Sequence, residues 1–186
     1  MPKRLDKILV IDVESTCWAE GPPAGQESEI IEIGFCLLDV PTLSREGKRS
    51  LLLRPERSTI SPFCTQLTSL TPADVAQGLS FAQACDLLRH KYHSRDRVWA
   101  SYGDYDRRQF ERQCQSRNIA YPFGPSHLNI KNILALIQGW PAEVGLAEAM
   151  EQLGGQMEGH YHRGHDDAWN IGWILARLLQ QGRLLA

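Results

Sequence analysis

Four separate stretches of the chain carry side chains that can do chemistry together. Asp12 and Glu14 flank a single valine near the start, Asp106 lies in the middle of the chain, and His162 comes five residues before Asp167. Carboxylate oxygens are the ligands that Mg²⁺ and Mn²⁺ prefer, and acids from separate segments can surround two cations about 4 Å apart while a phosphate ester still reaches them. A histidine beside such cations can accept a proton from water. The set therefore predicts metal-assisted hydrolysis of a phosphate ester.

The first acidic pair lies at the end of a predicted strand. Residues 7–12 are mostly aliphatic and β-branched, which is typical of a buried central strand. Because alternate side chains of a strand share a face, Asp12 and Glu14 are expected to point to the same side, at an edge open to solvent. An Asp-x-Glu pair by itself is more often a surface feature, so this assignment depends on the other acids.

Helical phase selects one acid from the second motif. If residues 106–117 form a helix, Asp106 lies one and two turns before Phe110 and Cys114, near the face expected to be buried, whereas Asp104 precedes the helix. We therefore predict that Asp106 is a metal ligand and that Asp104 is an ordinary N-cap.

The same argument applies to the last motif. A terminal helix over residues 165–180 would bury an apolar stripe that begins at Ile171, and Asp167 lies four residues before it. Asp167 is therefore predicted to face inward and Asp166 outward. A buried carboxylate needs a partner, because desolvating an unpaired charge is costly, and a metal cation is one such partner.

His162 cannot share a helix face with Asp167. Five helical residues would separate the two side chains by roughly 140°, so His162 is expected in a non-helical lead-in that Gly164 makes flexible. A neutral imidazole there can act as a general base. The alternative is a zinc site formed by His160, His162 and His165 with an aspartate. That arrangement leaves the strand carboxylates unexplained, and oxygen-rich sites suit Mg²⁺ or Mn²⁺ better.

The remaining elements form the scaffold that must position these residues. Strands are predicted over residues 7–12, 29–40, 50–53 and 97–101, and helices over residues 81–92, 106–117, 128–137, 146–153 and 165–180, with residues 127–130 also compatible with a strand. The short separations between the first three strands favour an antiparallel meander. This order predicts a mixed α/β sheet flanked by helices.

The composition fits one domain over residues 1–186, with 42% hydrophobic residues and no internal repeat. The apolar run at residues 8–11 is too short for a signal peptide or a membrane span, so we expect a cytoplasmic protein that does not act at a membrane. Five widely spaced cysteines without a Cys-x-x-Cys motif predict reduced thiols, several of them buried.

Charge limits the kinds of partner. A net charge of −2 argues against a protein that coats polyanions, because such binding relies on phosphate neutralisation by Lys and Arg. Basic residues do outnumber acids between residues 89 and 117. They form either a basic edge near the second acidic motif or, as is more common, an ordinary solvated helix face.

Several motifs, taken in order along nearly the whole chain, resemble one enzyme family. They are Asp12-Val-Glu14-Ser-Thr-Cys-Trp, Ser61-Pro-Phe-Cys-Thr-Gln-Leu-Thr68, Ser101-Tyr-Gly-Asp-Tyr-Asp106, Asn129-Ile-Lys131 and His162-Arg-Gly-His-Asp-Asp167-Ala-Trp-Asn-Ile. Together they look like the Eri-type exonucleases of the DEDDh branch of DnaQ-like 3′–5′ exonucleases. The resemblance implies a ribonuclease H-like fold, with three antiparallel strands followed by parallel strands.

The resemblance also implies roles for individual residues. Asp12, Glu14, Asp106 and Asp167 would bind two divalent ions, Mg²⁺ or Mn²⁺, and His162 would activate the attacking water. The catalytic residues would then be Glu14 and His162, both of them beside the terminal nucleotide. The related Tyr branch is not favoured, because no tyrosine lies four residues before Asp166 or Asp167.

Three further residues are candidates for holding the terminal nucleotide. The resemblance implies that the backbone of Ser15 contacts it. Trp18 and Phe63 are candidates for stacking on its base, because aromatic faces bind single-stranded bases with little sequence preference. Core packing is the alternative for both aromatic residues. Thr68 and Asn129 are expected to be turn or cap residues instead.

The activity implied is that of a 3′–5′ exonuclease which releases 5′-mononucleotides from the 3′ end of single-stranded nucleic acid. RNA is favoured over DNA by the Eri-type resemblance alone, since no residue can be assigned to a 2′-hydroxyl from the sequence. One alternative is a DNA-directed member of the same branch. The other is a binding module that keeps the fold without turnover, which the complete set of five site residues argues against.

Overall fold

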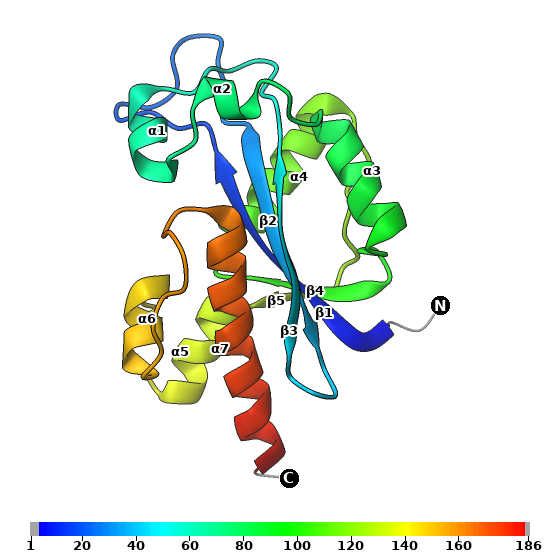
Figure 1. The fold of residues 1–186 in the computed structure, drawn as a ribbon, viewed down its shortest axis with the longest axis vertical. Helices are drawn as coiled ribbons and strands as arrows, with labels where there is room; N and C mark the ends of the chain where they lie inside the picture. Colours follow the sequence, from blue (N-terminus) through cyan, green and yellow to red (C-terminus); the bar gives the residue numbers. More distant parts are fainter. Residues whose placement is uncertain (1–3, 185–186) are drawn as a thin grey trace.

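A five-stranded mixed sheet forms the centre of the structure (Figure 1). This computed structural model describes residues 4–184. The strands are β1 (Arg4–Ser15), β2 (Ile30–Asp39), β3 (Arg45–Leu52), β4 (Arg97–Ser101) and β5 (His127–Asn129), in the spatial order β3-β2-β1-β4-β5. The first three strands pair antiparallel, whereas β4 runs parallel to β1 and β5 parallel to β4. The expected sheet, antiparallel first and then parallel, is confirmed.

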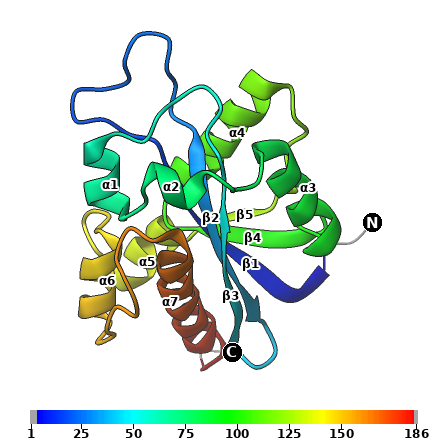
Figure 2. The same cartoon turned by 45° about the horizontal axis from the view of Figure 1, so that its top comes forward.

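Helices cover both faces of this sheet (Figures 1 and 2). They are α1 (Pro62–Thr68), α2 (Pro72–Val75), α3 (Phe81–Lys91), α4 (Tyr105–Arg117), α5 (Ile130–Gln138), α6 (Leu146–Gln152) and α7 (Gly164–Leu184). Helices α3 and α4 lie on one face and α5, α6 and α7 on the other, while α1 and α2 lie near the end of β1. In the part of the chain that the structure describes, none of these helices combines the length and the apolar character needed to cross a membrane.

Strand β1 divides its side chains between two hydrophobic cores. Leu9, Ile11 and Val13 pack against α3 and α4, and Ile8 and Val10 pack on the side of α7. Because side chains alternate along a strand, the next members of the second row are Asp12 and Glu14. The strand therefore carries its two acids out of the core beneath α7 and to the end of the sheet.

The clearest differences from the predicted elements concern β3, α1 and α2. Strand β3 begins at Arg45, whereas the prediction began at Ser50; its first half is polar because it forms the edge of the sheet and carries no alternating apolar pattern. Helices α1 and α2 were not predicted. Both are short, and each begins with a proline after a capping residue, Ser61 or Thr71, which is a usable local signal.

Other local predictions are confirmed. Ser80 caps α3 and accepts a hydrogen bond from the backbone of Gln83. Asn129 caps α5 in the same way, and the Thr68 hydroxyl bonds to the Cys64 carbonyl within α1, so both behave as structural residues. The five cysteines are free, and four of them are buried.

Two glycines allow α7 to begin directly on the sheet. A Cβ atom at Gly34 of β2 would lie 1.7 Å from the carbonyl carbon of Gly164, and one at Gly164 would lie 2.9 Å from the carbonyl oxygen of Asp12. No side chain fits between the helix and the sheet at this point. The sequence suggested that Gly164 gives flexibility; its role in the structure is close packing instead.

We predict that Gly34→Ala destabilises the protein by about 2–3 kcal/mol, because the added methyl group would push α7 away from β2. The control is Gly182→Ala near the end of α7, where an added Cβ meets open space. That change should be neutral or stabilising by up to about 1 kcal/mol, because alanine favours a helix. Thermal and denaturant unfolding measure both variants. Equal stability of Gly34→Ala and the wild type would contradict the close approach.

Candidate active site

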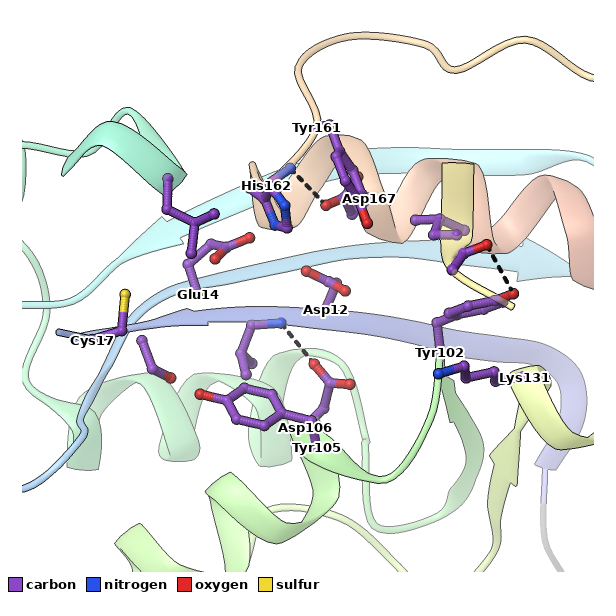
Figure 3. A pocket seen from close by; sticks show the side chains of 15 residues that line it. Asp12, Glu14, Cys17, Tyr102, Tyr105, Asp106, Lys131, Tyr161, His162 and Asp167 are labelled. Carbon is purple, nitrogen blue, oxygen red and sulfur yellow. Dashed lines mark hydrogen bonds between the residues drawn. The ribbon is translucent and has the colours of Figure 1, made fainter. Parts of the chain in front are cut away.

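A cleft of about 340 Å³ opens at the end of the sheet where β1 and β4 finish (Figure 3). Its walls include all five residues of the predicted catalytic set, Asp12, Glu14, Asp106, His162 and Asp167. They come from β1, from the start of α4, and from the start of α7 with the segment before it. The structure therefore brings together acids that lie up to 155 positions apart in the sequence.

Asp106 reaches the cleft although α4 lies on the opposite face of the sheet from α7. Its Oδ1 atom accepts a hydrogen bond of 2.9 Å from the backbone N–H of Val13, the residue between the two strand acids (Figure 3). Strand β4, which pairs with β1 on this side of the sheet, ends at Ser101 before the chain continues into α4. It therefore provides no backbone carbonyl that could accept the N–H of Val13. The carboxylate thus completes the sheet hydrogen bonding and locks α4 to the end of β1.

Asp167 and His162 are connected through the chain segment between them. The Oδ2 atom of Asp167 accepts a hydrogen bond of 2.9 Å from the backbone N–H of His162 (Figure 3). His162 lies outside α7, as predicted, and has a φ of 63°, in the left-handed region that residues with a Cβ atom rarely adopt. Such a conformation at a candidate catalytic residue must be held by the surrounding contacts.

The helical phase predicted for α4 is borne out. Asp106 is buried together with Phe110 and Cys114, whereas the side chain of Asp104 is 38% exposed. Asp104 does occupy the N-cap position, but its side chain makes no capping hydrogen bond and pairs with Arg107 instead.

The prediction that Asp166 faces outward is wrong. Asp166 is as buried as Asp167, at 5% and 4% exposure. It forms an ion pair with Lys48 of β3 and accepts a hydrogen bond of 2.8 Å from the backbone of His160. The apolar stripe of α7 does not reveal this burial, because the covering residues come from other parts of the chain. Asp166 does not line the cleft, so only Asp167 contributes there.

Burial makes the cleft acids hard to ionise. Desolvation is the largest cause for all four, and it raises the pKa of Asp12 well above its usual range. The pKa of Glu14 rises to about 9, and repulsion from Asp167 and other acids adds to that shift. The pKa values of Asp106 and Asp167 rise to about 7. Burial lowers the pKa of His162, because the charged imidazolium is disfavoured away from water.

The cleft residues fit divalent cations. The Oδ1 atom of Asp167 is buried and has no hydrogen-bond partner within the described chain. Ligand atoms of Glu14, His162 and Asp167 lie within 4.8 Å of one another, with Asp12 and Asp106 in the same cleft. Cations bound there would neutralise the negative charges of these closely spaced carboxylates. His160 and His165 lie outside this group, so the three histidines of the zinc alternative are not brought together.

The structure separates the nucleotide-contact candidates. Ser15 lines the cleft, but Trp18 and Phe63 do not. Phe63 is 42% exposed on α1, and Leu67, one turn later on the same helix, lines the cleft in its place. Stacking by the two aromatic residues stays a prediction.

The cleft-wall residues that sequence reasoning missed include three tyrosines and a lysine. They are Tyr102, Tyr105, Lys131 and Tyr161 (Figure 3). Each lies inside or next to one of the motifs that resemble the Eri-type exonucleases, so proximity to these motifs was the available signal. Among the lining residues Lys131 is the sole Lys or Arg, and the basic residues between 89 and 117 contribute none. Several of those pair with acids of the fold, as Arg117 does with Glu29.

The raised pKa values predict how stability depends on pH. Without metal, the cleft acids hold protons that the unfolded chain releases near pH 4, so the native state binds more protons. The free energy of unfolding should therefore fall as pH rises from about 4 through 7 and towards 9, the range set by Asp106, Asp167 and Glu14. Thermal unfolding in EDTA measures this fall. Mn²⁺ should reverse most of it, and Asp12→Asn should reduce it; a constant melting temperature in EDTA would contradict the prediction.

The cleft and its fold have counterparts among known proteins. The Exonuclease (RNase T) family model matches residues 9–175. The chain is 33% identical over 188 residues to 3′-5′ exoribonuclease 1 of Rattus norvegicus and 33% identical over 187 residues to that of Homo sapiens, with 95% of this chain covered. It spans about half the length of these curated relatives, 54% and 53%.

Solved structures give the same result. The nuclease domain of 3′hExo, described as a DEDDh family member bound to rAMP, aligns with a TM-score of 0.85 and 30% identity, covering 98% of this chain and 96% of that one. Cell-death related nuclease 4 aligns with a TM-score of 0.80 at 19% identity, covering 95% of this chain and 64% of that one, which shows a common fold. With the family model covering nearly all of the sheet and helices around the cleft, the chain belongs to the Exonuclease (RNase T) family.

Proposed function

We propose that this chain is a metal-dependent 3′–5′ exonuclease that releases 5′-mononucleotides from the 3′ end of single-stranded RNA. The observation that carries the proposal is the convergence of Asp12, Glu14, Asp106, His162 and Asp167 on one cleft in a chain of this family. A binding module without turnover would not need a crowded set of acids that raises its own pKa values. The intact set therefore favours an enzyme.

We infer that Asp12, Glu14, Asp106 and Asp167 hold two divalent ions, Mg²⁺ or Mn²⁺. Their carboxylate oxygens are hard ligands of the kind that Mg²⁺ and Mn²⁺ prefer. Ions bound there polarise a phosphodiester and make water acidic enough to lose a proton near neutral pH. The crowding of buried carboxylates supports two cations, since cations would offset both the burial and the charge repulsion that raise the pKa values of Glu14 and Asp167.

His162 is the proposed general base. Its ring lies beside Glu14 and Asp167, close to where a water bound to a cation held by these acids would lie. Because burial lowers its pKa, the imidazole is neutral at pH 7 and its free ring nitrogen can take the proton of that water. Glu14 lines the same cleft, next to Ser15, and we infer that it lies beside the terminal nucleotide as well as binding a cation.

The cleft favours a single terminal nucleotide over a duplex. Its volume of about 340 Å³ is at the low end of the range of about 300–1,000 Å³ for small-molecule sites. Lys131, the basic residue of the wall, lies 3.5 Å from Glu143 and offers the one positive charge of the wall for a backbone phosphate. RNA is favoured because the relatives with 33% identity carry the name exoribonuclease. A DNA substrate is the second candidate, and the likeness to DNA exonucleases at 12–19% identity supports the shared fold only.

We further propose that residues 1–186 act as one exonuclease domain in the cytoplasm. A single sheet joins the beginning and the end of the described chain, since α7 packs on β1 and β2. The five free cysteines suit a reducing compartment.

Replacing His162 by Ala should lower kcat by roughly 10²–10⁴-fold while Mn²⁺ still binds, because the residue moves a proton. In the wild type with saturating Mn²⁺, kcat should rise with pH and level off below about pH 6.5, the ordinary pKa of histidine, because burial lowers the pKa of His162. Loss of calorimetric Mn²⁺ binding in His162→Ala, or stoichiometric zinc in the wild type, would support the zinc alternative instead.

Polarity and strandedness test the activity itself. With matched 5′-labelled RNA and DNA oligonucleotides, we expect 5′-monophosphates released one at a time from a free 3′-hydroxyl, faster from RNA. A 3′-phosphate or a blunt duplex end should slow the reaction strongly. Asp12→Asn serves as the inactive control, and Asp104→Asn, outside the cleft, should retain activity. Rapid cleavage of a circular single strand would show an endonuclease and refute the proposal.

A further inference from the structure

Glu32 is a buried acid for which the proposed reaction gives no role. It lies on β2 directly opposite Glu14 of β1 and is 0% exposed. It does not line the cleft. A carboxylate this deeply buried needs strong hydrogen-bond partners, because the cost of desolvating an unpaired charge is several kcal/mol or more.

The partners of Glu32 come mostly from the segment that precedes Asp167. Its Oε2 atom accepts hydrogen bonds from Arg163 Nε at 3.1 Å and from the backbone N–H of Gly164 at 3.2 Å. Its Oε1 atom bonds to His165 Nδ1 at 2.8 Å and accepts from the Ser50 hydroxyl at 2.6 Å. Three consecutive residues, 163–165, are thus held by one side chain of the sheet.

These contacts keep Glu32 ionised. Burial alone would raise its pKa, but the hydrogen bonds from Ser50, His165 and Arg163 outweigh that effect and lower the pKa below its ordinary value. Glu14, its neighbour across the strands, shows the opposite shift. The two acids therefore differ in role: Glu14 lines the cleft, and Glu32 holds residues 163–165 by hydrogen bonds.

Residues 163–165 connect His162, which precedes α7, to Asp167 in its first turn. His162 stands just before these residues in a left-handed conformation, and Asp167 stands just after them in the first turn of the helix. The N–H group of Gly164 is one of the helix-terminal donors that lack a partner inside the helix, and a negative charge at this end of a helix is favourable. Glu32 supplies both the acceptor and the charge from another strand.

We propose that Glu32 is a positioning residue, which acts through residues 163–165 to hold the imidazole of His162 and the carboxylate of Asp167 towards the cleft. This inference rests on the proposed exonuclease function. It assigns Glu32 no contact with substrate or metal, since both of its oxygens are occupied by donors from the protein.

The test compares Glu32→Gln with a matched control, Glu29→Gln. Glu29 is also buried, at 1% exposure, and also binds an arginine, Arg117, together with the Ser58 hydroxyl. It does not line the cleft and holds a different loop. Both substitutions remove a buried charge of the same size, so both should lower the melting temperature to a similar extent.

Only Glu32→Gln should change the chemical step. With saturating Mn²⁺ and a single-stranded RNA oligonucleotide, we expect kcat to fall about 10- to 100-fold, the range typical of residues that orient catalytic ligands, with KM changed less than about twofold. Glu29→Gln should keep kcat within about twofold of the wild type. Equal kcat values in the two variants would overturn the proposal, because Glu32 would then be a structural ion pair only.

A double-mutant cycle tests whether Glu32 acts through the catalytic residues. Adding Glu32→Gln to His162→Ala should lower kcat by less than about threefold further, because residues that act through one another are not additive. A full additional 10-fold loss would refute the connection to His162. If Glu32→Gln does not fold, His165→Leu, which removes one donor of the clamp, should lower kcat by about threefold or more; an unchanged kcat would refute the proposal.

The two proposals fail in different ways. If the wild type releases no mononucleotide from any 3′ end, the proposed function is wrong and the kcat comparison has no basis. If the wild type is active and Glu32→Gln matches Glu29→Gln, the function stands and the positioning role is wrong.

Discussion

The crowding of carboxylates at one end of the sheet is the constraint on which the rest of this structure depends. Like charges repel, and removing them from water makes ionisation costly. Asp12, Glu14, Asp106 and Asp167 nevertheless share one cleft, and their pKa values are raised accordingly. A fold that tolerates such a cluster must hold each acid in place with contacts that do not neutralise it.

Backbone N–H groups provide such contacts for two of the four acids. Asp106 accepts the N–H of Val13, and Asp167 accepts the N–H of His162. Each bond restrains one oxygen of a carboxylate, and the other oxygen of Asp167 has no partner within the described chain. Glu32 is treated differently, because side-chain donors and a helix end occupy both of its oxygens. The structure thus distinguishes the acids that line the cleft from Glu32, whose carboxylate binds only protein groups, although β1 and β2 are adjacent strands.

Local sequence patterns were sufficient to predict which side chains share a face of a single strand or helix. The alternation of β1 placed Asp12 and Glu14 on one face, and the helical phase of α4 selected Asp106 over Asp104, as the structure bears out. The fold class and the order of the strands followed from similar patterns and from the resemblance of the motifs.

Features that depend on contacts between two elements could not be predicted from the sequence. Asp166 is buried against Lys48 of β3 and the backbone of His160, and Glu32 gains most of its partners from a segment more than 130 residues away. The edge strand β3 has a polar first half, so no alternation indicated where it begins. Trp18 and Phe63 were chosen because they are aromatic and lie in two of the motifs that carry the resemblance, whereas Leu67 of the second motif is the residue that lines the cleft.

The contact between Gly34 and Gly164 also determines how motion reaches the cleft. Helix α7 has 21 residues, so it is roughly 30 Å long, and it is fixed to the sheet at its first residue. A tilt of a few degrees about that fixed point moves the far end by roughly 2 Å but displaces Asp167, less than one turn away, by only a few tenths of an ångström. Apolar side chains such as Ile174 and Leu178 also hold α7 against the sheet further along its length. A displacement of Leu184 therefore reaches Asp167 strongly reduced, and the geometry of the acids changes little.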